Sequence, residues 1–244
     1  MKLYGLIGYP LGHSFSKIYF EEKFLKEHID AAFELFPMES IKEFPDVAAK
    51  NKNLLGLAVT IPYKEKIMSF LTRIDDAAKQ VGAVNCIKFS GEETTGYNTD
   101  TKGFEGSFLP LLKPHHTKAL VLGTGGASKA VQYVLRKNGI GFLTVSRTGR
   151  DEKNNIRYED IDEDIIWEYP VIINCTPVGM IPDEESQPAL PYHLLTKDHL
   201  LYDLVYKPAK TKFLEHGEKR GCIVKNGFEM LMIQAEENWR VWNS

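Results

Sequence analysis

Residues 119–128 read ALVLGTGGAS, a short apolar run that ends in three glycines within four positions. After this turn, apolar residues recur at the spacing of one buried helix face, at Ala127, Ala130, Val131, Val134 and Leu135. Asn138 and Gly139 then form a helix stop. The stretch therefore predicts a strand, a glycine turn and a helix.

A turn of this kind has a chemical use. Glycines let backbone amides approach a pyrophosphate, and the positive end of the following helix favours the anion. The strict dinucleotide fingerprint has glycine at its first two positions and glycine or alanine at its third. Here Gly123 and Gly125 fill the first two, and Ser128 stands at the third. A dinucleotide site and an ordinary strand-to-helix turn both remain open at this point.

The bulk properties are those of an ordinary soluble protein. A chain of 244 residues can form one large domain or two modest ones. Hydrophobic content of 43%, charged content of 26% and a net charge of −3 give no reason to expect a nucleic acid partner. The start, MKLYGLIGYP, lacks a signal-peptide pattern, and no segment approaches the roughly 20 apolar residues of a membrane span. We expect a cytoplasmic protein with no membrane partner.

The thiols and imidazoles do not suggest a metal. Cys86, Cys175 and Cys222 are far apart and odd in number, which indicates reduced, buried thiols and not a disulfide framework. His115 and His116 adjoin each other in KPHHTK, and a solvated loop is expected there.

The first elements lead to two hydroxyl groups. A strand is expected at residues 3–8, followed by a loop that ends in Ser14 and Ser16, either of which can cap the next helix. One serine suffices for a cap, so the other leaves a hydroxyl for an anionic ligand, although capping alone is a sufficient explanation. The helix is indicated by Ile18, Phe20, Phe24 and Leu25.

Further strands at residues 32–36 and 54–60 alternate with a helical segment at residues 41–50, which indicates parallel βαβ units. Pro62 fits the first position of a helix with Tyr63, Ile67, Phe70 and Leu71 on one face. Lys64 then falls in the first helical turn, where the macrodipole opposes its charge. A solvated lysine tolerates that position at little cost. A lysine that is placed for acid–base chemistry is the alternative explanation, because residues that break a local rule often have a functional role.

Polar residues also appear near strand ends. Asn85 interrupts an apolar strand at residues 82–89, and Asp100 follows the turn SGEETTG in the segment GYNTDTKGF. Ligands of open α/β sheets gather at such ends, whereas Asp100 could also be only the cap of the helix running toward Leu112. Residues 113–117 resemble a boundary linker.

The second strand of the nucleotide unit, residues 140–145, leads into Ser146, Arg147 and Thr148, with Arg150 close by. An NAD site has an acidic residue here for the ribose 2′-hydroxyl, and an arginine accommodates the 2′-phosphate of NADP. The pattern favours NADP, with a solvated basic turn as the alternative.

The C-terminal part continues the alternation. An acidic helical crossover at residues 159–168 precedes a strand at 171–175 with the turn TPVGM, and a strand at 200–205 ends at Tyr206. A helix at residues 211–220 and a strand at 222–224 follow. The final helix, from Gly227, is expected to bury Phe228, Leu231, Met232, Ala235, Trp239 and Trp242. Met230 and Gln234 fall on its flank, and Gln234 is expected at the surface unless the helix lines a cleft.

Eight motifs occur together in one order: GYPLGHSFSK, VTIPYK, GAVN, GYNTD, GTGGAS, NCTPVGM, YDLVYKP and NGFEMLMIQA. With them the chain resembles the shikimate dehydrogenase family over nearly its whole length. The resemblance implies NADP-dependent, reversible reduction of 3-dehydroshikimate to shikimate in aromatic amino-acid biosynthesis. It implies an α/β fold with a parallel-sheet catalytic domain, residues 1–103 plus 226–244, and a Rossmann-like NADP-binding domain, residues 104–225, with the active site in the cleft between them.

The resemblance also implies roles for single residues. Lys64 and Asp100 match the catalytic pair, with Lys64 as proton donor to the developing alkoxide. The matches to substrate contacts are Ser14 and Ser16 for the carboxylate and Thr60, Asn85, Tyr206 and Gln234 for the ring. The matches to cofactor contacts are Gly123, Gly125, Gly126 and Ala127 at the pyrophosphate, Ser146, Arg147 and Thr148 at the 2′-phosphate, Gly227 near the nicotinamide, and Thr176 and Met230.

One residue departs from the family pattern. Asparagine usually stands two residues before the threonine of VTIPYK, where this chain has Ala58. Losing a buried hydrogen-bond partner typically costs about 1–3 kcal/mol, so substrate affinity or choice is affected. Two rival functions stay open, a quinate or shikimate dehydrogenase that uses NAD and a non-catalytic nucleotide-binding sensor. The sequence does not distinguish a monomer from a homodimer.

Overall fold

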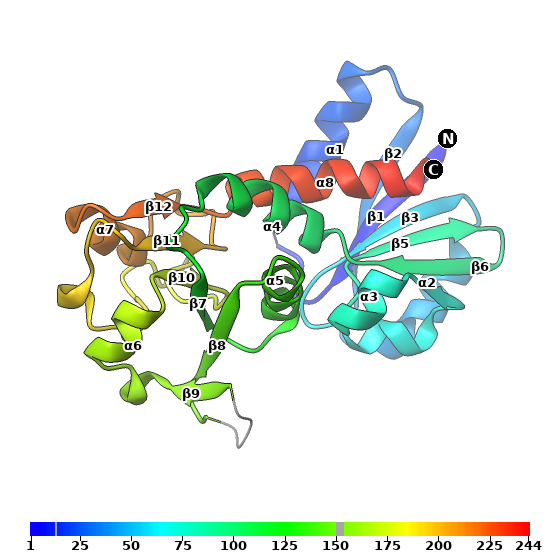
Figure 1. The fold of residues 1–244 in the computed structure, drawn as a ribbon. Helices are drawn as coiled ribbons and strands as arrows, with labels where there is room; N and C mark the ends of the chain where they lie inside the picture. Colours follow the sequence, from blue (N-terminus) through cyan, green and yellow to red (C-terminus); the bar gives the residue numbers. More distant parts are fainter. Residues whose placement is uncertain (13, 150–153) are drawn as a thin grey trace. The chain divides into compact units, whose positions relative to one another are not determined.

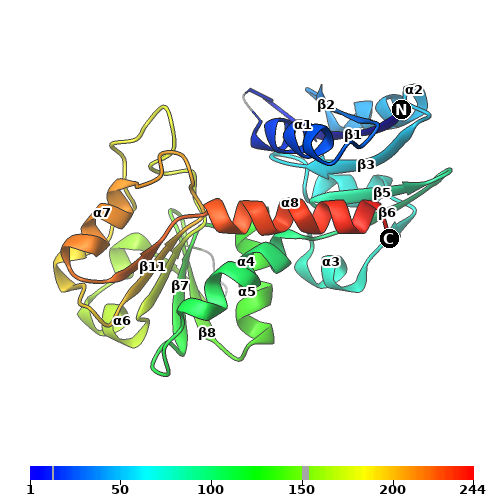
Figure 2. The ribbon, with the colours of Figure 1, turned by 90° about the horizontal axis from the view of Figure 1, so that it is seen from above.

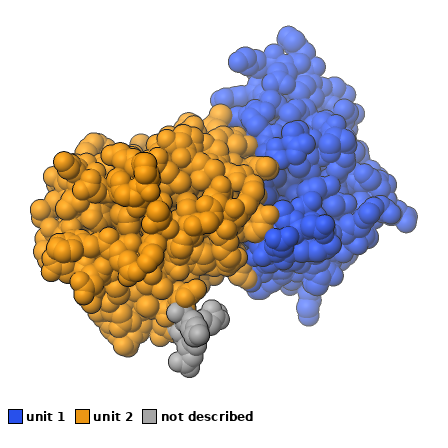
Figure 3. Space-filling model, in the orientation of Figure 1, with its two compact units in different colours: residues 1–99, 235–244 blue, residues 100–234 orange. Residues whose placement is uncertain are grey.

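A computed structural model describes residues 1–12, 14–149 and 154–244. Two compact units make up the chain, as Figure 3 shows. Unit 1 comprises residues 1–99 and 235–244, and unit 2 comprises residues 100–234. Within the described residues, no helix is long and apolar enough to cross a membrane.

Across the described residues, unit 1 is built on a six-stranded sheet with the order β2-β1-β3-β5-β6-β4. β1 pairs in parallel with β2 and β3, whereas β5 runs antiparallel to β3 and β6. The sheet is therefore mixed, because β5 and β6 form a hairpin and hairpin strands are antiparallel. The strands are β1 (Lys2–Gly8), β2 (Ala31–Pro37), β3 (Leu54–Val59), β4 (Arg73–Ile74), β5 (Cys86–Ser90) and β6 (Glu93–Tyr97).

The turn expected at SGEETTG is wrong, since most of it is strand β6. Thr94 and Thr95 are β-branched residues, which fit a pleated strand, and only Gly91 and Glu92 form the turn.

Helices cover both faces of the sheet of unit 1 (Figures 1 and 2). One buried cluster joins β1 and β3 to α2 (Phe44–Lys50), α3 (Asp76–Val81) and the 3-10 helix η2 (Lys66–Phe70), and the 3-10 helix η1 (Ile41–Glu43) leads into α2. The other cluster joins the sheet to α1 (Phe15–Lys26) and to the C-terminal part of α8 (Phe228–Trp242).

The apolar face of α1 differs from the expectation. Phe20 and Phe24 are buried, but Ile18 and Leu25 are 55% and 80% exposed. Of the four expected residues, Phe20 and Phe24, four positions apart on one helix face, therefore pack in the cluster against the sheet.

In the part of unit 2 that the structure describes, six strands form a parallel sheet with the order β12-β11-β10-β7-β8-β9. This is the doubly wound dinucleotide-binding order. From β7 the chain adds successive strands toward one edge of the sheet, and from β10 it adds them toward the other edge, so the strand order reverses between β7 and β10. Ligands of such sheets bind outside the carboxyl ends of the strands at that point. The strands are β7 (Lys118–Leu122), β8 (Gly141–Ser146), β9 (Asn155–Arg157), β10 (Val171–Asn174), β11 (Leu200–Asp203) and β12 (Ile223–Lys225).

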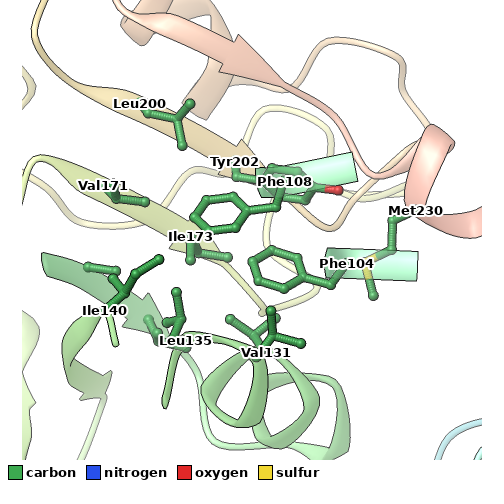
Figure 4. Close-up of a cluster of buried hydrophobic side chains, with 13 residues drawn as sticks. Phe104, Phe108, Val131, Leu135, Ile140, Val171, Ile173, Leu200, Tyr202 and Met230 are labelled. Atoms are coloured by element: carbon green, nitrogen blue, oxygen red, sulfur yellow. The ribbon is translucent and has the colours of Figure 1, made fainter. Parts of the chain in front are cut away.

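Two apolar layers hold the helices of unit 2 to this sheet. Figure 4 shows the first layer, in which Phe104 and Phe108 of α4 (Asp100–Phe108) point toward Ile173 and Tyr202. α5 (Gly126–Lys137) completes that layer, and α6 (Glu163–Glu168) and α7 (Lys212–Lys219) form the opposite one. The 3-10 helices are η3 (Leu109–Leu111), η4 (Tyr158–Asp160) and η5 (Tyr192–Leu194).

Residues 113–117 lie inside unit 2 and do not link the two units. His116 is 3% exposed, so the expected solvated loop is wrong for this residue. Its Nδ1 accepts from the Lys113 amide, and the Nε2 atoms of His115 and His116 both lie 3.0 Å from the Asp198 carbonyl oxygen. The backbone partners of the ring nitrogens explain why His116 is buried. Cys86 is buried, whereas Cys175 and Cys222 are half-buried free thiols.

Candidate active site

The two serines at the start of α1 have different positions. Ser14 is the N-cap, and its hydroxyl accepts from the Lys17 amide at 3.4 Å. Ser16 is half-buried in the first helical turn and is not the cap. The capping explanation thus accounts for Ser14, and Ser16 is the second hydroxyl at the same helix end.

Lys64 does not lie in a helix, so the expected helix from Pro62 is wrong. Its carbonyl accepts from the Val84 amide at 2.7 Å, which removes it from helical hydrogen bonding, and η2 begins only at Lys66. A helix macrodipole therefore does not oppose the charge of Lys64. Tyr63 is buried in the core and donates its hydroxyl to the Met38 carbonyl. That anchor fixes the half-buried Lys64 in a turn just after β3 and Thr60.

Asn85 is held on both sides of its amide group. Its Oδ1 accepts from the Thr99 amide at 2.7 Å, and its Nδ2 donates to the Thr99 hydroxyl at 3.0 Å. The Thr99 hydroxyl donates in turn to Oδ1 of Asn238 at 2.6 Å. All three residues are at most 3% exposed. Thr99 and Asn238 were not among the residues predicted from the sequence, although Asn238 follows Gln234 by four positions in the same helix.

Ala58 is 5% exposed and lies opposite Leu6 and Cys86 in the strand register. It belongs to the apolar cluster under α1 and α8. The position offers a methyl group where the family pattern has an amide.

Gln234 is 8% exposed, which corrects the expectation of a surface residue. The cause is the close approach of α4, because a Cβ on Gly103 would lie 3.0 Å from the Gln234 Cβ and 2.5 Å from the Met230 carbonyl oxygen. Met230 is buried in the core of unit 2, whereas Phe228, expected in the buried stripe, is 47% exposed. Asp100, the first residue of α4, is 6% exposed. Asp100, Met230 and Gln234 all belong to unit 2.

The glycine turn follows β7, at the point where the strand order of the sheet of unit 2 reverses. Gly123 has a φ of +104°, a conformation that favours glycine, and a Cβ there would lie 3.0 Å from Thr176 Cγ2. α5 begins after Gly125, which provides no side-chain cap, and a Cβ on Gly125 would meet nothing within 4 Å. There is thus open space beside Gly125, and Gly126 and Ala127 form the first turn of a helix whose amino end favours an anion such as a pyrophosphate.

Ser128, the departure from the strict fingerprint, has a structural role. Its side chain is buried, and its hydroxyl donates to the Gly123 carbonyl at 2.7 Å. Because this bond ties the helix to the turn, a serine at the third position is compatible with a nucleotide site.

Between Ser146 and Gly149, the part of the loop after β8 that the structure describes, there is no acidic residue. Arg147 and Thr148 are exposed, and the Ser146 hydroxyl donates to Oδ1 of Asn155 at 3.1 Å. Burial, and to a smaller extent the nearby Cys175, raises the pKa of Tyr158 to about 12, and the positive charge of Arg147 opposes that rise. A cation here fits a 2′-phosphate. Arg150 lies outside the described residues.

Three further predicted residues follow β10 and β11. Thr176 donates its amide and its hydroxyl to Oδ1 of Asn174, at 3.0 and 2.6 Å. Tyr206 is half-buried, and burial raises its pKa. A Cβ on Gly227 would overlap the Leu204 carbonyl, which explains why glycine is needed there. The residues present in unit 2 therefore fit an NADP molecule.

The sheet of unit 2 is parallel and doubly wound, with a glycine turn at the point where its strand order reverses and an arginine after the next strand. These features define an α/β enzyme of the NADP-dependent oxidoreductase class. Residues 6–87 match the family model described as the shikimate dehydrogenase substrate binding domain. The NADP(+)-dependent shikimate dehydrogenase of Aquifex aeolicus is 36% identical over 251 residues, which cover 99% of this chain and 91% of the relative. The chain belongs to the shikimate dehydrogenase family.

Solved structures agree with this assignment. Shikimate 5-dehydrogenase of Thermus thermophilus, in complex with NADP(H) and shikimate, has a TM-score of 0.87 and 27% identity over 99% of this chain and 93% of that one. Quinate dehydrogenase of Corynebacterium glutamicum, in complex with NAD, has a TM-score of 0.87 and 28% identity over the same shares of the two chains. The fold is thus common to proteins solved in complex with NADP(H) and with NAD, so the fold by itself does not set the cofactor.

Proposed function

We propose that this chain catalyses the reversible, NADP-dependent interconversion of 3-dehydroshikimate and shikimate in aromatic amino-acid biosynthesis. The observation that carries the proposal is the geometry at the carboxyl edge of the sheet of unit 2. An open glycine turn lies after β7, and an exposed arginine stands where NAD enzymes have an acid. The family assignment supports the same cofactor.

The cofactor residues all belong to unit 2. Gly123, Gly125, Gly126 and Ala127 bind the pyrophosphate, and Ser146, Arg147 and Thr148 bind the 2′-phosphate. Thr176, Gly227 and Met230 contact the nicotinamide end. When bound, NADPH supplies the hydride that reduces the ring carbonyl.

The proposed substrate residues supply hydroxyl and amide groups. Ser14 and Ser16 bind the carboxylate, and the ring substituents contact Thr60, Asn85, Tyr206 and Gln234. Lys64 gives a proton to the oxygen of the reduced carbonyl. Asp100 orients the lysine and binds the adjacent hydroxyl, so the two act as one pair. Ala58 offers no amide to the ring, and the affinity for shikimate is correspondingly lower than in relatives with asparagine there.

Exchanging Lys64 for alanine tests the proposed role of this residue. Lys64→Ala is expected to lower turnover by about 10²-fold or more, the size of a lost general acid. The Kd for NADPH, measured by nucleotide fluorescence, is expected to stay within about twofold. Lys66→Ala is the matched control, because Lys66 is exposed two residues further on. Unchanged turnover in Lys64→Ala, or weaker nucleotide binding without a turnover defect, contradicts the assignment.

Steady-state rates with shikimate or quinate and with NADP or NAD separate the rival functions. We expect the highest kcat/KM for shikimate with NADP. A preference for NAD contradicts the assignment of Arg147, and no oxidation of shikimate with either cofactor favours a non-catalytic sensor. A cytoplasmic location and a monomeric or homodimeric state stay predictions.

A further inference from the structure

Asp203 is a buried carboxyl group that the proposed mechanism does not use. It ends β11 and is fully buried, in a sheet that carries an apolar layer on each face. A buried carboxylate is costly unless it is hydrogen-bonded. The hydrogen-bond partners of Asp203 therefore indicate the role of this residue.

The carboxylate accepts hydrogen bonds from three separate segments. Oδ1 accepts from the Val205 amide at 3.0 Å and from Nδ2 of Asn174 at 2.9 Å, and Oδ2 accepts from the Thr211 hydroxyl at 2.6 Å. Asn174 is the direct register partner of Asp203 on β10 and is also fully buried. The bond between them crosses from one strand end to the next.

Asp203 fixes which way the Asn174 amide points. A carboxylate can only accept, so Asn174 must turn Nδ2 toward Asp203 and Oδ1 away from it. That Oδ1 accepts both the amide and the hydroxyl of Thr176. Thr176 in turn lies against the glycine turn, as its Cγ2 would be 3.0 Å from a Cβ on Gly123.

A second branch leads to another cofactor residue. The Val205 amide donates to Asp203, and the Val205 carbonyl accepts from the Gly227 amide at 3.2 Å. Each of the two cofactor residues is thus linked to Asp203 through one intermediate residue. Asn174 links Thr176 to Asp203, and Val205 links Gly227 to it.

We propose that Asp203 is a positioning residue of the cofactor site, which holds Thr176 through Asn174 and Gly227 through Val205. The inference rests on the proposed NADP-dependent function, because it assigns Asp203 to the nicotinamide end of that site. Asp203 itself contacts no substrate or cofactor. Its carboxylate sets the orientation of groups that do.

The test compares Asp203→Ala, Thr176→Val and the double variant. Each single change is expected to raise the Kd for NADPH about tenfold, the effect of one lost hydrogen bond. In the double variant the Kd for NADPH is expected to rise by much less than the product of the two single increases, because both changes interrupt one chain of contacts. Unchanged Kd values in the single variants, or fully multiplicative effects in the double variant, overturn the proposal.

His199→Ala is the matched control, because His199 is a buried residue just before the amino end of the same strand. It contacts the Thr196 amide and the Ile166 carbonyl. This variant is expected to lower the Tm and leave the Kd for NADPH within about twofold. An equal rise in Kd in His199→Ala shows general loosening of the sheet and also overturns the proposal.

Hydrogen exchange of the nucleotide-free protein gives a readout independent of activity. The Thr176 amide is expected to exchange at least tenfold faster in Asp203→Ala, with the β7 amides unchanged. If Asp203→Ala does not fold, Asn174→Ala replaces it, since Asp203 then keeps its bonds to Val205 and Thr211. Wild-type protein that neither binds NADPH nor oxidises shikimate refutes the proposed function, whereas the exchange result still reports the link from Asp203 to Thr176.

Discussion

In the proposed site, cofactor choice depends on Arg147. Its guanidinium is exposed after β8, where an acid would repel a 2′-phosphate and an arginine binds it. Hydrogen bonds to a charged group contribute about 1.5–3 kcal/mol, so Arg147→Ala is expected to raise the Kd for NADPH about 10- to 100-fold. The Kd for NADH, which lacks the phosphate, is expected to stay within about twofold.

Nucleotide fluorescence titrations with both cofactors measure this difference. Arg136→Ala is the control, because Arg136 is an exposed arginine in the last turn of α5, at the opposite end from the glycine turn. Equal losses for NADPH and NADH in Arg147→Ala contradict a specific phosphate contact.

Asp203 also predicts a pH dependence of stability. Burial raises the pKa of Asp203 from 3.8 to about 6, although Thr211, Val205 and Asn174 donate hydrogen bonds to it. Between these two values the folded state binds more protons than the unfolded state. The stabilisation from this group is therefore complete below about pH 4 and is lost as the pH rises through about 6.

The free energy of unfolding of wild type minus that of Asp203→Asn isolates this effect, because other carboxyl groups titrate equally in both proteins. A pKa shift of this size corresponds to about 2–3 kcal/mol. We expect the difference to fall by that amount between pH 4 and pH 7.5 in urea unfolding of the nucleotide-free protein. A difference that is constant with pH contradicts the raised pKa.

Single residues could be predicted from the sequence where chemistry and position agree. The turn glycines and Arg147 follow a strand directly, so their place at the sheet edge follows from the strand pattern. The buried partners Asn174, Thr99 and Asn238 could not be found in this way, because their role depends on contacts between segments far apart in the chain. The catalytic role of Lys64 stays a prediction.

At the scale of elements, strands and long helices followed from periodicity, and short segments did not. α5 ends at Asn138 and Gly139 as the capping pattern predicts. The helix expected from Pro62 fails because the Lys64 carbonyl bonds to Val84, a tertiary contact without a local signal. The surface position expected for Gln234 fails for a related reason, since burial comes from α4 at Gly103.

The contact between α4 and α8 gives a prediction with an internal control. A Cβ on Gly103 would lie 2.5 Å from the Met230 carbonyl oxygen, so Gly103→Ala forces the helices apart at an expected cost of about 1–3 kcal/mol. Because Gln234 lies at the same crossing, the KM for shikimate is expected to rise. Urea unfolding and steady-state kinetics measure the two effects.

Gly106→Ala serves as the control on the same helix. The nearest atom to its added Cβ is Ile233 Cδ1 at 3.1 Å, the flexible end of a side chain. Alanine favours a helix over glycine by about 1 kcal/mol, so this variant is expected to be neutral or stabilising with an unchanged KM. Equal destabilisation by both substitutions contradicts a specific crossing at Gly103.

At the scale of the whole molecule, the class of fold followed from the alternation of strands and helices. The β5–β6 hairpin was not predicted, because a parallel crossover and a hairpin begin with the same strand pattern. The return of the C-terminus to the first unit was implied only by the family resemblance. In the structure the return is physical, since residues 235–244 supply Ala235, Val241 and Trp242 to a core of unit 1.

Trp242 is the residue through which the chain end stabilises unit 1. Its ring stacks on Tyr4 at 5.1 Å, its indole nitrogen donates to the Ile87 carbonyl at 3.0 Å, and it fills the space above Gly56. Truncating a buried Trp typically costs about 3–5 kcal/mol, and that loss is expected in Trp242→Ala. Trp167→Ala, at a position 61% exposed, is expected to cost less than about 1 kcal/mol.

The two buried clusters of unit 2 contain no residue of unit 1, so the loss is expected to be confined to unit 1. In a urea titration of Trp242→Ala, shikimate oxidation should therefore disappear at a lower concentration than NADPH binding. The tryptophan fluorescence transition of unit 1 is expected to follow the loss of activity. Loss of oxidation and of nucleotide binding at the same urea concentration would show that the two units unfold together, and it contradicts a loss confined to unit 1.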